Sequence, residues 1–167
     1  MVEVRLSAVK VDLQSNTPVL LLTETSGAGR SLPIFIGAPE ATAIAFAVQG
    51  VATPRPMTHD LFRDVLEELG VRLERVVITE LRSATYYAEL HLVSNGTTVH
   101  VSSRPSDAVA LAVRTGSPLF VADELMDAEA IVLPTEDEDE EEDLSPEELV
   151  GQFRQFLDQV RPEDFSS

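Results

Sequence analysis

The order of strand and helix patterns is the feature that most constrains the fold of this chain. Residues 2–12 alternate between apolar and polar side chains, as a half-buried strand does. Up to Val121 the patterns predict three strands, two helices, three strands, one helix and a final strand. Because strands and helices do not alternate regularly, this order predicts an α+β fold with a mostly antiparallel mixed sheet and helices packed on it.

Turn residues separate the predicted strands. The run Ser15 to Pro18 predicts a turn between the first two strands, and Gly27 to Gly29 predicts the next turn. The strongest hairpin signal is Asn95-Gly96 between two apolar runs, because this dipeptide suits a tight type I′ turn. The predicted strands are residues 2–12, 18–24, 31–37, 71–81, 84–93, 97–102 and 119–121.

Three predicted helices begin at residues typical of helix starts and end at glycines. Each has an acidic residue in its first turn, where the helix dipole favours negative charge. Thr58 is expected to cap the second helix. That helix also carries a stripe of apolar side chains, made of Leu61, Val65, Leu66 and Leu69. The starts with their acids are Pro39 with Glu40, Thr58 with Asp60 and Pro105 with Asp107, and the ends are Gly50, Gly70 and Gly116.

The sequence divides into a domain at residues 1–133, an acidic linker at 134–144 and a C-terminal segment at 145–167. Every residue from 136 to 143 is acidic, so this run is expected to be solvated and extended. The terminal segment starts with a capping-box pattern and predicts an amphipathic helix. We expect that helix to dock on its own body, on a neighbouring subunit or on another protein.

Charge and composition exclude several classes of protein. The formal net charge is −17, and residues 1–133 hold 16 acidic and 10 basic side chains. This balance argues against a broad basic face for nucleic acid. The chain has no cysteine, which excludes disulfides, thiolate zinc sites and cysteine nucleophiles. The sequence shows no secretory signal pattern and no apolar run long enough for a bilayer, so a cytoplasmic location without membrane contact is expected.

Polar residues gather at the three predicted helix starts. In one interpretation Glu40, Asp60 and Asp107 bind a divalent metal. His59, Asp60 and Asp107 are then the catalytic residues, and His59 transfers protons. Phosphate would then be bound by Arg55, Arg104 and Ser106. In the structural interpretation, the acids only complement helix dipoles, the histidine packs and the arginines fix loops. Spacing along the chain does not show whether the three clusters meet.

Four sequence blocks extend this reasoning to a known family. They are Leu32–Gly37, Glu40-Ala41, Pro54–Leu61 and Arg104–Ala112. Their order and spacing over roughly residues 3–133 resemble the bifunctional nuclease domain family, formerly classed as a domain of unknown function. The resemblance implies an α+β fold that self-associates as a dimer or larger homo-oligomer, and nuclease activity on DNA and RNA. Ser102 departs from the acidic residue that the family often has there.

Two hypotheses about function follow. The first is a metal-dependent nuclease of broad specificity, a hydrolase that cleaves phosphodiester bonds of DNA and RNA with Mg²⁺ or Mn²⁺. The second is a non-catalytic oligomeric module that binds an anion at helix N-termini and acts in binding or regulation. The resemblance favours the enzyme, whereas the acidic body and Ser102 favour the binding module.

Overall fold

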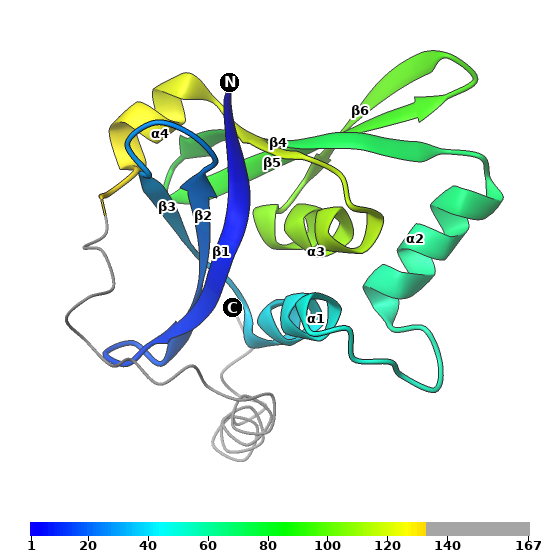
Figure 1. Cartoon of the computed structure of the whole chain (residues 1–167), viewed down its shortest axis with the longest axis horizontal. Coiled ribbons are helices and arrows are strands. Elements are labelled where there is room, and N and C mark those ends of the chain that lie inside the picture. Colours follow the sequence, from blue (N-terminus) through cyan, green and yellow to red (C-terminus); the bar gives the residue numbers. More distant parts are fainter. Residues whose placement is uncertain (133–167) are drawn as a thin grey trace. The chain divides into compact units, whose positions relative to one another are not determined.

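The computed structural model describes residues 1–132, which form one sheet and four helices (Figure 1). The predicted linker at 134–144 and the predicted helix at 145–167 lie outside these residues. Within residues 1–132, no helix is long and apolar enough to cross a membrane. The strands are β1 (Val2–Asp12), β2 (Thr17–Glu24), β3 (Ser31–Phe35), β4 (Arg72–Arg82), β5 (Thr85–Ser94), β6 (Thr97–Ser103) and β7 (Leu119–Val121). The helices are α1 (Ala38–Val48), α2 (Thr58–Glu68), α3 (Pro105–Thr115) and α4 (Asp123–Glu129).

The seven strands form a mixed sheet in the order β3-β2-β1-β7-β4-β5-β6. Neighbouring strands run antiparallel, except that β4 and β7 are parallel. The short strand β7 joins the two halves of the sheet, because Val121 pairs with Val2 and Leu119 pairs with Val76. This architecture confirms the predicted α+β fold with a mostly antiparallel mixed sheet, and the predicted order of strands and helices along the chain up to β7.

Helix α3 lies at the centre of the molecule. It contacts β4 and β5, and the helices α1 and α2 pack against it. Figure 1 shows α1 and α3 next to each other in the angle between the two halves of the sheet. Ala108, Ala110 and Ala112 are buried along α3, and Ala41 and Ala43 are buried on α1. Alanines leave little side chain between helix axes, so the two helix starts come close together.

Backbone geometry confirms the predicted hairpin and corrects two helix and strand boundaries. Asn95 and Gly96 both have positive φ, at 49° and 77°, as a type I′ turn requires. Strand β3 ends at Phe35, two residues before the predicted end. The predicted cap at Thr58 is wrong: Met57 is the N-cap, and its N–H donates to Asp60 Oδ2 at 3.0 Å.

Helix α4 is absent from the sequence-based prediction. It has only seven residues and buries Leu125 and Met126, which is too short a pattern to show a helical period. Arg30 connects it to the sheet: the guanidinium pairs with Glu24 at 2.6 Å and with Asp127 at 2.8 Å.

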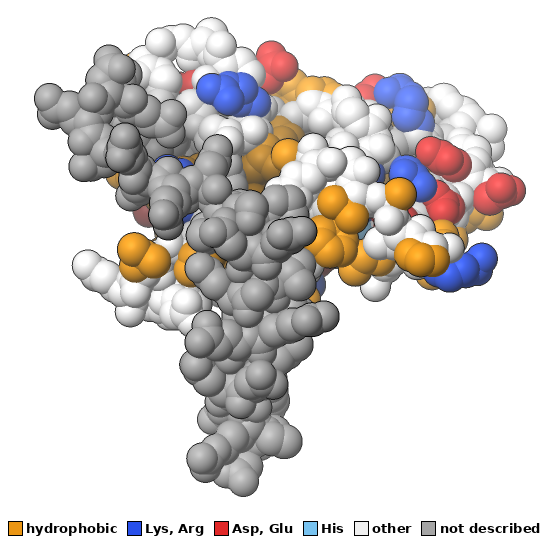
Figure 2. Space-filling view, turned by 60° about the horizontal axis from the view of Figure 1, so that its bottom comes forward, with side chains coloured by type: hydrophobic (Ala, Val, Ile, Leu, Met, Phe, Trp, Pro, Cys, Tyr) orange, Lys and Arg blue, Asp and Glu red, His pale blue; other side chains and the backbone are white. Residues whose placement is uncertain are grey.

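Helix α2 turns most of its apolar stripe to solvent. Leu66 is buried, whereas Leu61, Val65 and Leu69 are exposed, as is Phe62. Hydrophobic side chains are visible on the right of Figure 2, the side on which α2 lies in Figure 1. Leu66 is the buried residue of α2, and His59 and Asp60 form polar contacts with α3, which the amphipathic pattern alone does not reveal.

The turn between β4 and β5 is strained and generates a stability prediction. Ser83 and Ala84 have φ of 49° and 59°, a region that costs side-chain-bearing residues about 1–2 kcal/mol each. Replacing Ala84 with Gly should therefore raise the free energy of unfolding by about 0.5–1 kcal/mol, measured by urea denaturation. Ala47→Gly inside α1 is the control and should lower it by a similar amount. Lower stability in Ala84→Gly would contradict the left-handed geometry of this turn.

Candidate functional site

The starts of α1, α2 and α3 contribute side chains to one polar cluster. Asp107, in the first turn of α3, accepts a hydrogen bond from Arg104 Nε at 2.7 Å. Its other oxygen lies 2.9 Å from Nε2 of His59, in the first turn of α2. Arg104 also donates from Nη2 to Glu40 of α1 at 3.0 Å. The four residues therefore form a continuous chain, which we call the Glu40–Arg104–Asp107–His59 cluster.

Gly37 permits the position of the Glu40 carboxylate. A Cβ atom at residue 37 would lie 2.2 Å from Glu40 Oε2, far closer than atoms approach. Gly37 is the N-cap residue of α1, so the carboxylate folds back over the start of its own helix. The glycine at this position leaves room for Glu40 to meet Arg104.

Electrostatics keep the central carboxylate ionised. Burial alone would raise the pKa of Asp107, but the hydrogen bonds from Arg104 and His59 outweigh it and lower the pKa. The same contact raises the pKa of Arg104. Because an ionised carboxylate has no proton to give, the His59–Asp107 hydrogen bond is donated by His59 Nε2. In a neutral His59 ring, Nδ1 then carries the lone pair.

Exposure differs along the cluster. The Arg104 side chain is 66% exposed, whereas His59, Asp107 and Glu40 are half-buried. Arg104 uses Nε and Nη2 for carboxylates, and its Nη1 has no hydrogen bond to any residue in 1–132. The cluster thus presents one charged donor to solvent above a half-buried histidine and carboxylate.

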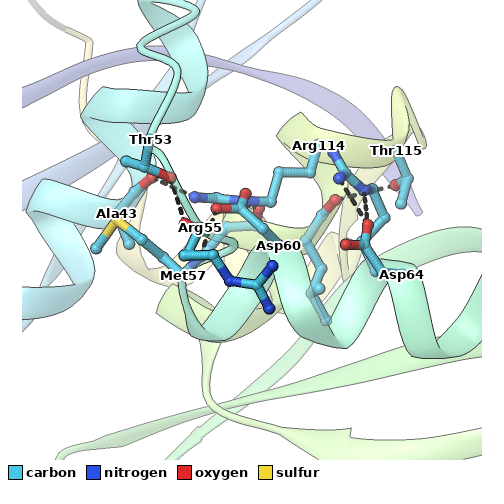
Figure 3. A network of polar contacts seen from close by, with 11 residues as sticks. Ala43, Thr53, Arg55, Met57, Asp60, Asp64, Arg114 and Thr115 are labelled. Carbon is cyan, nitrogen blue, oxygen red and sulfur yellow. Dashed lines mark hydrogen bonds and ion pairs between the residues drawn. The ribbon is translucent and has the colours of Figure 1, made fainter.

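Asp60 belongs to a different network, although it is adjacent to His59 in sequence. Its Oδ1 accepts from Arg114 Nε at 2.7 Å, and its Oδ2 accepts from the N–H of Met57 (Figure 3). The Arg114 contact lowers the pKa of Asp60 despite partial burial. With both oxygens bonded, Asp60 fixes the start of α2. Within residues 1–132, the Asp60 side chain has no hydrogen bond or ion pair with Glu40 or Asp107.

Arg114 is the residue of this region that the sequence-based prediction missed. Its side chain is only 4% exposed, and it donates to the carbonyl oxygens of Ala43 and Ala110 as well as to Asp60. It therefore ties α1 and α2 to α3. The sequence pattern that could have predicted this role is a single arginine in the apolar run of α3, because a buried charge requires partners.

Among the described residues, the side chains of two further predicted residues form no hydrogen bond with the cluster. Arg55 is exposed, and its carbonyl oxygen accepts from Thr53 Oγ1 at 2.7 Å (Figure 3). Ser106 is buried at the start of α3. Burial leaves the Ser106 hydroxyl little access to a phosphate in solvent. Among the predicted phosphate contacts, Arg104 is the one that the structure places in the cluster.

Comparison with known proteins decides the family. The model of the bifunctional nuclease domain matches residues 20–134 of this chain. The chain belongs to the bifunctional nuclease domain family. The matched region includes all four members of the Glu40–Arg104–Asp107–His59 cluster. The resemblance inferred from the sequence blocks is thus confirmed.

Relatives divide into two groups. An uncharacterized protein of Mycobacterium tuberculosis is 44% identical over 165 residues, which is 99% of this chain and 98% of that protein. Bifunctional nuclease 1 of Oryza sativa subsp. indica is 28% identical over 105 residues, and Bifunctional nuclease 2 of Arabidopsis thaliana is 30% identical over 105 residues. Each plant match covers 61% of this chain and 32% of the relative, so the chain spans about a third of those proteins.

The Arg114–Asp60 pair is tested by a double-mutant cycle. Arg114→Met leaves a half-buried carboxylate unpaired and should lower the free energy of unfolding by about 3 kcal/mol. Asp60→Asn keeps an oxygen for the N–H of Met57 but leaves the more buried Arg114 without a counter-charge, so it should cost a similar amount. If the pair acts as a unit, adding Asp60→Asn to Arg114→Met should cause little further loss in urea denaturation. Fully additive losses would show that the two side chains do not interact.

Proposed function

We propose that the protein is a nuclease of broad specificity that hydrolyses phosphodiester bonds in DNA and RNA. The observation that carries this proposal is the 2.9 Å contact between His59 Nε2 and Asp107, with Arg104 bound to the same carboxylate. Membership of the bifunctional nuclease domain family and the names of the plant relatives support the same reaction class.

The His59–Asp107 pair suits proton transfer from an attacking water. Asp107 holds the ring in the form with the proton on Nε2, so Nδ1 is the atom that can accept a proton. A carboxylate behind a histidine also stabilises the positive ring that forms after proton transfer. The pair therefore serves as a general base in this proposal.

Arg104 suits the binding of the phosphate group. Its side chain is exposed beside Asp107, and the guanidinium offers a charged donor at Nη1. Charge-assisted hydrogen bonds from arginine to phosphate are among the stronger polar contacts in proteins. An isolated cationic contact also fits a chain without a broad basic face, since a few phosphate contacts are sufficient for a single cleavage site.

We propose further that hydrolysis depends on Mg²⁺ or Mn²⁺. Glu40 and Asp107 would be the carboxylate ligands, because Arg104 joins the two in one cluster, whereas the carboxylate of Asp60 is bonded in the separate Arg114 network. A divalent ion commonly takes one or two carboxylates, with substrate oxygens completing its shell. When bound, it would neutralise phosphate charge next to Arg104.

The second candidate is a non-catalytic module that binds an anion. The exposure of Arg104 favours it, because the guanidinium offers Nη1 as a donor that can hold an anion without any reaction. In this case Arg104 would bind phosphate groups, but His59 would accept no proton from water.

Substitution of Asp107 separates the two candidates. Asp107→Asn removes the charge that orients His59, so cleavage of single-stranded RNA and DNA with Mn²⁺ should fall by about 10²–10⁴-fold. His59→Gln should give a similar loss. Gel assays of both substrates measure the rates, and circular dichroism checks that the variants stay folded.

Asp64→Asn is the matched control for this experiment. Asp64 lies on α2 like His59, but pairs with its neighbour Arg63 at 2.6 Å, outside the cluster. The Asp64→Asn variant should cleave at the rate of the unaltered chain, and EDTA should abolish cleavage by both proteins. Activity that survives in folded Asp107→Asn would exclude the proposed pair. Absence of cleavage by the unaltered chain with either metal would favour the anion-binding module.

A further inference from the structure

A second cluster of titratable side chains lies on strands β5 and β6. His91 of β5 pairs in register with His100 of β6, and Glu89 precedes His91 by two residues on the same strand face. Ala88 and Leu90, the two neighbours of Glu89 in sequence, are buried on the other face of the sheet as part of the hydrophobic core. This group, Glu89–His91–His100, is therefore separate from the Glu40–Arg104–Asp107–His59 cluster.

The spacing of the three side chains matches a coordination shell. One ligand atom from each lies within 4.8 Å of the others. Glu89 Oε2 is 3.4 Å from His91 Nε2 and 3.7 Å from His100 Nδ1. Ligands at about 2.0–2.2 Å from a tetrahedral zinc ion lie about 3.3–3.6 Å apart. The two nitrogen–oxygen distances thus need little change to accept one ion. The two imidazole rings are stacked, with centroids 3.9 Å apart and planes at 18°, so the His100 ring must rotate for both lone pairs to face that ion.

The buried nitrogen of His91 is an independent sign of a missing partner. His91 is 5% exposed, and its Nε2 is fully buried without a hydrogen bond to any residue in 1–132. A buried polar atom without a partner is unfavourable by about 1–3 kcal/mol, and a ligand at Nε2 would remove that cost.

We propose that Glu89, His91 and His100 bind one transition-metal dication, with Zn²⁺ as the best fit. Two imidazoles and one carboxylate form a ligand set that proteins use for zinc. Mg²⁺ prefers oxygen ligands, so it fits this group poorly. Three protein ligands leave one position of a tetrahedral ion open for water or a further ligand. The His100 side chain is 54% exposed, so its ring can turn its lone pair toward the ion.

Arg75 controls access to the site. Its Nε donates to His91 Nδ1 at 3.0 Å, and arginine can only donate. Nδ1 therefore holds the lone pair, and Nε2 carries the proton in the metal-free ring. Binding at Nε2 moves the ring proton to Nδ1, which requires Arg75 to turn away. The site is thus selective for ions that bind imidazole strongly enough to displace this contact.

Calorimetric titration of the full chain with ZnCl₂ tests the proposal. An excess of Mg²⁺ in the buffer occupies carboxylate-only sites, including those of the acidic run at 136–143. One Zn²⁺ should bind per chain. Glu89→Gln and His100→Gln should each weaken binding by at least tenfold, since even residues that only support ligands contribute about 10–100-fold. The Glu89 and His100 side chains are 40% and 54% exposed, so neither substitution disturbs the hydrophobic core.

Arg75→Gln is the gain-of-binding variant. Its amide oxygen can accept a hydrogen bond from Nδ1–H, and a positive charge next to the ion is lost, so Zn²⁺ should bind more tightly. Glu80→Gln on β4 and Asp64→Asn on α2 are controls that should bind as the unaltered chain does. Absence of Zn²⁺ binding, unchanged binding in His100→Gln, or weaker binding in Arg75→Gln would overturn the proposal. None of these results depends on nuclease activity.

Discussion

The packing of α3 between the sheet, α1 and α2 is the constraint on which the rest of the structure depends. The buried residues Ala108, Ala110 and Ala112 let the helix lie close to its neighbours. The starts of three helices then meet at one place, where free backbone N–H groups and aligned dipoles favour negative charge. Glu40 and Asp107 supply that charge, and Arg104 balances both.

Two arginines bind first-turn aspartates in opposite environments. The side chain of Arg114 is buried and binds Asp60 of α2, as well as carbonyl oxygens of α1 and α3. Its charge therefore stabilises the arrangement of the three helices. Arg104 is exposed and binds the half-buried Asp107, and its remaining donor, Nη1, is available to a ligand. The contrast explains how neighbouring residues on α2 take different roles: Asp60 positions the helix, whereas His59 belongs to the cluster that we propose as catalytic.

The sequence predicts local structure well because its signals are local. Asn95-Gly96 specifies its turn through backbone geometry, and alternation specifies the strands. Contacts between distant residues are another matter: His59 and Asp107 are 48 positions apart, and no spacing rule links them. Asp60 looked equivalent to Asp107 in sequence, since both follow a helix start. Only the position of Arg114 distinguishes them. The proposed docking of the segment at 145–167 and self-association remain predictions.

The protonation state of His59 tests the central claim most directly. If ionised Asp107 accepts the hydrogen bond from Nε2, nitrogen-15 NMR of the neutral ring should show the proton on Nε2 and a lone pair on Nδ1. The Nε2 proton should shift when Asp107 is replaced by Asn and stay unchanged in Asp64→Asn. A neutral ring protonated on Nδ1, or one that does not respond to Asp107→Asn, would contradict the account.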